Sequence, residues 1–396
     1  MLHTFTLYSN QILSYLLDGL PEEETAPLST PAAETAAKHL RFADRRNAET
    51  IILFGAGDGR LAKELAEKKK GNQILLICDL FPQQIRRLTA NGFDSIINQN
   101  CAVLTDSSIW SQLLLLIQNG YNAADSHLIL NPALTGDSKK KHQNLQKIFS
   151  GTKKLALPES HGHGKISAAA ILSPDEPDLK DFINNFPEWV NEIVLVWDTS
   201  ELNHIRENEE FQNKKIIHIC QKLNADFSAQ RNRMLQHCSG DWVIYLDADE
   251  RLDNASWDIL RQATALEACD CWYLPRMTFY PDSSNSRIGY GLWPDLQLRL
   301  FKNTSRLRFI NRIHEKLTGI QGKSGILPDC PIQHLTHILK SREKIENKLK
   351  NFDQAAGGKV SHRLGKEFPN ILNEFIDPGK DRKVGPLLLP DINLTC

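Results

Sequence analysis

Two aspartates one residue apart offer the most definite chemistry in this sequence. Asp247 and Asp249 come directly after the apolar run 242–246, which reads Trp-Val-Ile-Tyr-Leu. A run of this kind predicts a buried β-strand, so both carboxylates would emerge at its carboxyl end. Carboxylate oxygens are the ligands that Mg²⁺ and Mn²⁺ prefer, and such an ion neutralises a diphosphate. An acid pair after a strand is equally compatible with a solvated turn.

Strand and helix patterns alternate around this acid pair. Four apolar runs read as strands: 166–172, 192–197, 215–219 and 242–246. Leu179, Phe182 and Phe186 recur at helical spacing between the first two. Strands and helices that alternate in this way form a mostly parallel sheet, and ligands bind at the carboxyl ends of its strands. Further strands are expected within 272–280 and 295–301.

Four ordered motifs give this pattern a family resemblance. They are Phe227–Leu235, Gly240–Glu250 (GDWVIYLDADE), Trp293–Phe301 (WPDLQLRLF) and Arg312–Glu315 (RIHE). In this order they resemble the family-two glycosyltransferases with the GT-A fold. The closer resemblance is to a bacterial subgroup that includes lipopolysaccharide-core sugar transferases. It covers about residues 165–340, which is under half of the chain.

The resemblance implies how a nucleotide-diphosphate sugar would be held. Asp198, at the end of the second strand, would bind the base of the donor. Arg231 would lie near the base or the diphosphate. Asp247 would contact the ribose and the metal, and Asp249 would ligate the metal directly. The implied cofactor is Mg²⁺ or Mn²⁺, and the implied sugar is a hexose or a heptose.

The same resemblance implies the residues that do the chemistry. Glu315 stands where the family keeps its catalytic acid residue, and it would take the proton from the acceptor as this attacks the anomeric carbon. In-line attack inverts that carbon, and the metal stabilises the leaving diphosphate. Asp295 is the second candidate for the base. His314, or one of His334 and His337, would complete the metal site.

The sequence departs from the family pattern at the ends of the first two strands. Residues 173–177 read Ser-Pro-Asp-Glu-Pro where an Asn-Glu pair is usual. Residues 198–201 read Asp-Thr-Ser-Glu where Asp-x-Gly-Ser is usual. Both segments belong to the edge that binds the base, so the identity of the nucleotide stays open.

A glycine-rich motif marks the amino-terminal part of the chain. The apolar run 50–54 leads into Gly55, Gly57 and Gly59, and a second run ends in Asp79. Strand, glycine turn, helix, strand and acid begin a Rossmann-like unit, in which the glycines would admit a nucleotide and Asp79 would bind its ribose. The segment resembles S-adenosylmethionine methyltransferases and the Rossmann-like part of Maf-type glycosyltransferases. A tight turn that only connects strand to helix explains the same residues.

Composition places the chain among globular proteins of ordinary type. Lys and Arg number 47 and Asp and Glu 48, so the basic excess typical of nucleic-acid binders is missing. The 8 cysteines form no C-x-x-C pair, which argues against a thiolate zinc site and favours a reducing compartment. We identify no signal peptide and no transmembrane run. We therefore expect a cytoplasmic protein, and peripheral membrane association is compatible with this sequence.

We therefore expect an α/β protein in three parts. These are a Rossmann-like accessory domain at 1–150, a GT-A domain at 160–336, and a helical carboxyl-terminal tail at 337–396 with Ile345 and Leu349 on one face. The glycine-rich stretch between the two domains reads as an exposed linker.

The expected activity is metal-dependent, inverting transfer of a sugar to a glycan, a lipid-linked saccharide or a protein, as in the bacterial cell envelope. Two alternatives stay open. One is a bifunctional protein with an S-adenosylmethionine-dependent methyltransferase at its amino terminus. The other is a non-catalytic binding module on a decayed transferase fold.

Overall fold

The computed structural model divides the chain into two compact units. It describes residues 2–15, 21–159, 164–201, 215–341, 343, 345, 368–377 and 383–390. Unit 1 consists of residues 1–152, 287–294 and 367–384. Unit 2 consists of residues 153–286, 295–366 and 385–396. Unit 1 thus includes two late segments in addition to the amino-terminal part from which an accessory domain was expected.

Unit 1 is built on a four-stranded parallel sheet with the order β3-β2-β1-β4. The strands are β1 (Thr50–Phe54), β2 (Ile74–Asp79), β3 (Cys101–Thr105) and β4 (Ser126–Leu130). Their apolar runs are buried almost throughout, as strands covered on both faces require. The order matches the first four positions of the doubly wound 3-2-1-4-5-6 arrangement.

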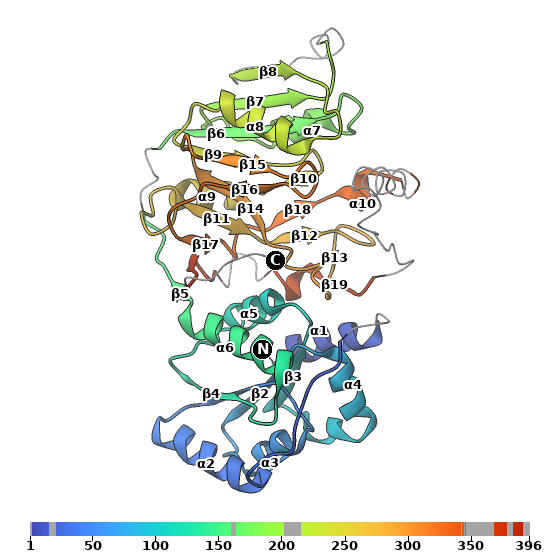
Figure 1. Cartoon of the computed structure of the whole chain (residues 1–396), viewed down its shortest axis with the longest axis vertical. Helices are drawn as coiled ribbons and strands as arrows, with labels where there is room; N and C mark the ends of the chain where they lie inside the picture. The colour runs from blue at the N-terminus through green and yellow to red at the C-terminus, as the bar shows by residue number, and fades with distance from the viewer. Residues whose placement is uncertain are drawn as a thin grey trace. The chain divides into compact units, whose positions relative to one another are not determined.

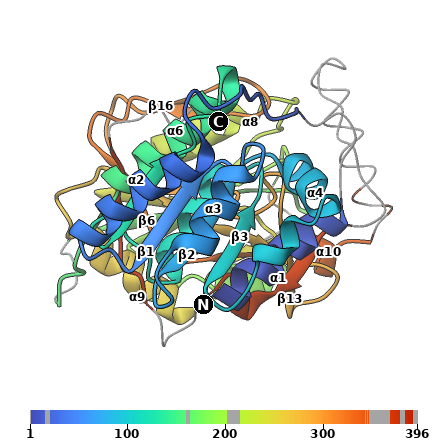
Figure 2. The ribbon, with the colours of Figure 1, turned by 90° about the horizontal axis from the view of Figure 1, so that it is seen from below.

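Helices cover both faces of this sheet. The helical segments are α1 (Leu2–Ser14), α2 (Ala32–Arg45), α3 (Arg60–Lys68), α4 (Pro82–Ala90), the 3-10 helix η1 (Phe93–Ile96), α5 (Ile109–Gln118) and α6 (Gly136–Gly151). Figure 2 shows α2 and α3 side by side, and both pack on the face that carries Leu53 and Leu75. On the other face the rings of Phe54 and Phe149 are 6.4 Å apart, which brings α6 onto β1.

Unit 2 is built on a nine-stranded mixed sheet with the order β5-β20-β17-β11-β14-β9-β6-β7-β8 (Figure 1). In chain order its strands are β5 (Lys153–Lys154), β6 (Ile166–Leu172), β7 (Glu192–Trp197), β8 (Ile216–Cys220), β9 (Trp242–Tyr245), β11 (Cys271–Leu274), β14 (Gln297–Lys302), β17 (Ser324–Ile326) and β20 (Leu387–Leu388). Strands β9, β6, β7 and β8 are parallel, whereas β14 is antiparallel to β9 and β11. The α/β fold class predicted from the sequence is confirmed.

Short helices and two small sheets complete unit 2. The helices are α7 (Leu179–Asn184), α8 (Phe227–His237), α9 (Asn254–Ala263) and α10 (Thr336–Leu339). One small sheet has the order β10-β18-β12 and contains β10 (Glu250–Arg251), β18 (Ile332–His334) and β12 (Arg276–Thr278). The other pairs β15 (Arg308–Ile310) with β16 (Lys316–Thr318). The first small sheet starts directly after β9, so it brings residues from three segments to the end of that strand.

The carboxyl-terminal region contains more than the helix expected for it. Its described part also forms β19 (Asn370–Leu372), the 3-10 helix η3 (Asn373–Phe375) and β20. Strand β20 joins the large sheet between β17 and β5, because its backbone pairs with both. Leu349 of the expected helix and residues 160–163 of the expected linker lie outside the described residues. Within the described part of the chain, no helix combines the length and hydropathy needed to span a membrane.

Candidate active site

Asp247 and Asp249 lie at the carboxyl end of β9. Leu246 N–H still donates to Ala169 O of β6 at 3.1 Å, so the chain keeps its sheet pairing up to the first aspartate. A tight turn follows, in which Glu250 N–H donates to Asp247 O at 2.9 Å. Asp247 N–H donates in return to Glu250 Oε2 at 3.0 Å. The turn directs the two aspartate side chains into different surroundings.

Two buried arginines hold Asp247. Its Oδ1 accepts from Arg231 Nη2 at 3.0 Å, and its Oδ2 accepts from Arg299 Nη2 at 2.7 Å. Both guanidinium groups lie over the Tyr245 ring, at 4.6 and 4.5 Å from its centroid. Burial alone would raise the pKa of Asp247, but Arg299 and Arg231 hold that pKa well below its usual range. Asp247 is therefore a carboxylate throughout the physiological pH range.

The ion-pair network continues from Arg299 to Asp295. Arg299 Nη2 also donates to Oε1 of the fully buried Glu250 at 2.6 Å, and Arg276 Nη1 reaches the same oxygen at 3.3 Å. Arg276 Nε donates to Asp295 Oδ2 at 2.8 Å. The other Asp295 oxygen accepts from Gln297 Nε2 at 2.9 Å. Both carboxylate oxygens of Asp295 are thus engaged.

Glu315 joins the same network through Arg231. Arg231 Nε donates to Glu315 Oε1, while Arg231 Nη2 holds Asp247. Burial would lower the pKa of Arg231, but Asp247, Tyr245 and Glu315 raise it, so Arg231 stays positively charged. The Glu315 side chain is 14% exposed, and within the described residues its Oε2 has no hydrogen-bond partner. Arg231 therefore connects Asp247 to Glu315 and leaves one Glu315 oxygen free.

Asp249 meets a separate set of partners. Its Oδ1 lies 3.6 Å from His334 Nε2, and its Oδ2 lies 3.4 Å from Lys340 Nζ. Lys340 Nζ also pairs with Glu176 Oε2 at 2.8 Å. Burial would lower the pKa of Lys340, but Asp249 and Glu176 raise it. The other nitrogen of the His334 ring contacts Thr278 Oγ1 at 2.9 Å, which orients Nε2 toward Asp249.

The donor set around Asp249 fits a divalent cation in its chemistry. A carboxylate oxygen and an imidazole nitrogen face each other at a distance that one ion can bridge. Asp247 differs, because arginines engage both of its oxygens. His314 lies in an exposed turn with a φ of 52°. Among the described residues, the possible ligand atoms of Asp247, Asp249 and His314 do not all lie within 4.8 Å of one another.

Asp198 follows β7 and contacts the backbone near the end of β8. Its N–H donates to Leu172 O at 2.8 Å, and its Oδ1 accepts from Leu223 N–H at 2.7 Å. These bonds order the chain at the carboxyl ends of β6 and β8. The described contacts of Asp198 do not include Arg231 or Asp247.

Several charged residues of this site were not predicted from the sequence pattern to have a role. They are Glu176, Glu250, Arg276, Arg299 and Lys340. Arg299 carried a usable signal, because it stands between two leucines in a predicted strand, where an arginine is buried only with acid partners. Lys340 carried no such signal, since it reaches Asp249 from the end of a separate short helix.

In unit 1 each carboxylate oxygen of Asp79 accepts a hydrogen bond from the backbone. Its Oδ2 accepts from Ala56 N–H, and its Oδ1 accepts from Phe81 N–H, both at 2.7 Å. Asp79 thereby ties the glycine-rich loop after β1 to the end of β2. Its expected role toward a ribose stays a prediction.

The glycine-rich loop packs against the chain's own side chains. Gly55, Gly57 and Gly59 have φ values of 86°, 59° and 79°, a region that favours glycine. A Cβ at Gly55 would lie 2.5 Å from Leu134, and a Cβ at Gly57 would lie 2.7 Å from Asn131. Close packing of the loop therefore explains two of the glycines, and a nucleotide near them stays a prediction.

The fold and the site together define a class of protein: an α/β domain with a strand that ends in two aspartates, the first of which is held by two arginines. Residues 176–317 match the family model of glycosyl transferase family 2. This part of the chain is therefore a glycosyl transferase family 2 domain. The matched segment contains the acid pair, Arg231, Arg299 and Glu315.

Curated relatives resemble the chain over part of its length. Identity is 36% over 152 residues with a TPR repeat-containing protein of Synechococcus elongatus, which is 38% of this chain and 35% of that protein. It is 23% over 216 residues with the SPbeta prophage-derived glycosyltransferase SunS of Bacillus subtilis, which is 52% of this chain and 46% of SunS. The chain spans less than half the length of these relatives.

Two solved structures that match part of the chain contain a nucleotide sugar. One is S. aureus TarS 1-349 in complex with UDP-GlcNAc, at 13% identity over 50% of this chain and 68% of that chain, with a TM-score of 0.32. The other is the mannosyltransferase PcManGT from Pyrobaculum calidifontis in complex with GDP-Man and Mn²⁺, at 14% identity over 36% and 45% of the two chains, with a TM-score of 0.28. These TM-scores are too low to indicate function.

Proposed function

We propose that unit 2 is an inverting glycosyltransferase that takes a sugar from a nucleotide-diphosphate-sugar donor. One observation carries the proposal. In a segment that matches glycosyl transferase family 2, Arg231 joins Asp247, at the end of β9, to Glu315, a carboxylate with a free oxygen. A donor site and a base are thus linked by one buried side chain. The acceptor is a glycan, a lipid-linked saccharide or a protein.

The donor diphosphate would lie beside Asp249. Asp249 and His334 would hold Mg²⁺ or Mn²⁺, which neutralises the charge that develops on the leaving diphosphate. We assign the histidine ligand to His334 in place of His314, because His334 faces Asp249. Lys340, which pairs with both Asp249 and Glu176, would contact a phosphate oxygen of the donor. Asp198 remains the candidate for contact with the base of the nucleotide.

Glu315 is the better candidate for the catalytic base. A base must offer an unengaged oxygen to the acceptor hydroxyl or amine. Glu315 keeps Oε2 free, whereas Arg276 and Gln297 engage both oxygens of Asp295. Arg231 orients Glu315 through its hydrogen bond to Oε1, and Asp295 positions Arg276 within the network.

A binding screen of the full chain tests the donor site. We expect one of UDP, GDP, CDP and TDP to raise the melting temperature in the presence of Mn²⁺, because a ligand that binds only the folded state stabilises it. Asp249→Asn should abolish this shift. Asp258→Asn, which changes an exposed aspartate of α9, should preserve it. A shift with S-adenosylmethionine and with none of the diphosphates would move the chemistry to unit 1.

Single-residue kinetics test the base. Glu315→Gln should lower kcat by about 10²–10⁴-fold, the usual contribution of a general base, while the nucleotide shift persists. Gln retains an oxygen that can accept from Arg231, so positioning is largely kept. Asp295→Asn should have a smaller effect. If Asp295→Asn lowered kcat strongly and Glu315→Gln did not, Asp295 would be the base.

A further inference from the structure

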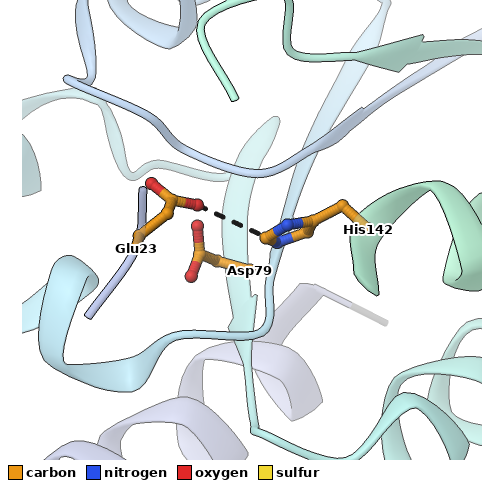
Figure 3. Close-up of side chains that lie close together, drawn as sticks. All are labelled: Glu23, Asp79 and His142. Carbon is orange, nitrogen blue, oxygen red and sulfur yellow. Dashed lines mark ion pairs between the residues drawn. The ribbon is translucent and has the colours of Figure 1, made fainter. Parts of the chain in front are cut away.

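Unit 1 brings three potential metal ligands together in its interior. Glu23, Asp79 and His142 each offer a ligand atom within 4.8 Å of the other two, and Figure 3 shows the three side chains turned toward one another. Each of the three side chains is fully buried. They come from the segment before α2, the end of β2 and the first half of α6. Three distant parts of the sequence thus converge on one point.

Glu23 is the unusual member of this cluster, because its side chain is fully buried and no lysine or arginine of the described residues pairs with it. Both of its carboxylate oxygens are buried without a hydrogen-bond partner, and Oε1 lies 4.0 Å from His142 Nε2. Neither Glu23 nor Asp79 pairs with a lysine or arginine of the described residues. Two adjacent buried carboxyl groups need a proton or a cation to offset the cost of desolvation.

The backbone around Glu23 is held in place from both sides. Glu24 N–H donates to Ser138 Oγ at 2.7 Å, and Thr135 N–H donates to Glu24 O at 3.0 Å. Ala26 N–H donates to Ala133 O at 2.8 Å. Glu23 therefore points into the cluster because its neighbours are fixed, which is the preorganisation that a ligand site requires.

The other two residues are oriented as metal ligands usually are. His142 Nδ1 donates to Ser138 O at 2.9 Å, so Nε2 carries the lone pair of the ring, and Nε2 lies 4.0 Å from Glu23 Oε1. Burial lowers the pKa of His142, which keeps the ring neutral. Two backbone N–H groups fix the carboxylate of Asp79, whose oxygens retain further lone pairs. Leu80 N–H donates to His142 Nε2 at 3.1 Å, and a bound ion would replace this hydrogen bond.

We propose that Glu23, Asp79 and His142 bind a divalent metal ion that accepts both carboxylate and imidazole ligands, such as Zn²⁺ or Mn²⁺. The ion replaces the proton that Glu23 and Asp79 would otherwise need. It also links the segment around Glu23 to β2 and α6. This site uses residues of unit 1 only. It does not rest on the proposed transferase activity or on the metal at Asp249.

Metal counting on the full chain tests the site. The chain carries Asp249→Asn to remove the metal proposed for unit 2, and it is dialysed against Zn²⁺ or Mn²⁺, passed through a desalting column and analysed for bound metal. We expect one ion per chain to remain with one of the two metals. Glu23→Gln on this background should remove that ion. Glu22→Gln, the same change at a 63% exposed neighbour, should leave it in place.

Thermal unfolding separates loss of the ligand from loss of the fold. Without metal, Glu23→Gln should melt no lower than the parent, because it removes a buried acid that has no partner. With metal, the parent and Glu22→Gln should gain melting temperature, whereas Glu23→Gln should not. The proposal is overturned if the Asp249→Asn chain binds neither metal, or if Glu23→Gln and Glu22→Gln retain equal amounts. In that event the acid pair is neutralised by a proton alone.

Discussion

The two units bury acidic side chains in opposite ways. In unit 2 the buried Glu250 and the adjacent Asp247 each contact an arginine, and Arg299 contacts both. In unit 1 neither Glu23 nor Asp79 pairs with a lysine or arginine of the described residues, and Asp79 accepts from two backbone N–H groups. The first arrangement carries its own counter-charge, and the second requires a proton or a cation from outside the chain.

This difference indicates what each arrangement is suited to do. A network of fixed ion pairs keeps its charges over a wide pH range and holds carboxylates in one geometry, which a charged substrate requires. Two buried acids without a basic partner depend on the proton or the cation that neutralises them. We therefore expect substitutions in unit 2 to act through lost pairing, and substitutions in unit 1 to act through protons or metal.

The largest effect on stability is expected from Arg299→Leu. This change leaves Glu250 and Asp247 without their shared cation, and loss of one partner of a buried ion pair destabilises by about 3–5 kcal/mol. Hydrogen exchange of the β9 and β14 amides would measure the loss locally. Arg312→Leu is the matched control, because Arg312 is 69% exposed and pairs with Asp226 at 3.7 Å. Equal effects of the two changes would mean that the buried network contributes no more than a surface pair.

The next largest effect is a pH dependence confined to unit 1. Asp106 is fully buried, and its carboxylate accepts from Tyr8 OH at 2.5 Å and Ser108 N–H at 2.9 Å, with no lysine or arginine partner among the described residues. Burial, despite these hydrogen bonds, raises the pKa of Asp106 to about 6. Between the pKa of the unfolded chain, about 4, and this value, the folded state holds a proton that the unfolded state has lost. Stability therefore falls as pH rises through this window, by about 3 kcal/mol in total.

Asp106→Asn should remove this dependence, because an amide does not ionise. Hydrogen exchange of the β3 amides at pH 4 and pH 6.5 would measure it. The wild-type chain should lose protection between these pH values, and the variant should lose much less. Asp247→Asn should leave the same window unchanged, because the pKa of Asp247 lies below it. Identical slopes for wild type and Asp106→Asn would show that other groups titrate in unit 1.

The sequence predicted the strands more fully than the site. The run 242–246 and the acids after it specified β9 and its end, because strand patterns and turns are local properties. Asp247 and Glu315 are 68 residues apart in the sequence numbering, and only packing shows that Arg231 touches both. No local pattern distinguishes His314 from His334 as the neighbour of Asp249. That choice depends on the pairing of β10 with β18.

Glu23 illustrates the same limit in unit 1. It lies in a run of three glutamates that reads as a solvated, acidic stretch. The structure buries the middle glutamate beside Asp79 and leaves Glu22 exposed. Hydrogen bonds from Glu24 and Ala26 decide which side chain turns inward, and these join segments more than 100 residues apart.

The smallest effect on stability is expected for an ion pair that is exposed, because burial is what separates the acidic side chains of the two units. Glu22 and Arg87 form an ion pair whose side chains are 63% and 55% exposed. Water solvates both charges whether or not they pair, so Arg87→Ala should change the free energy of unfolding by no more than about 1 kcal/mol. The change should shrink further at high salt, which screens exposed charges. Denaturant unfolding at low and high salt would measure it. A loss as large as that of Arg299→Leu would mean that burial does not determine how strongly this protein depends on an ion pair.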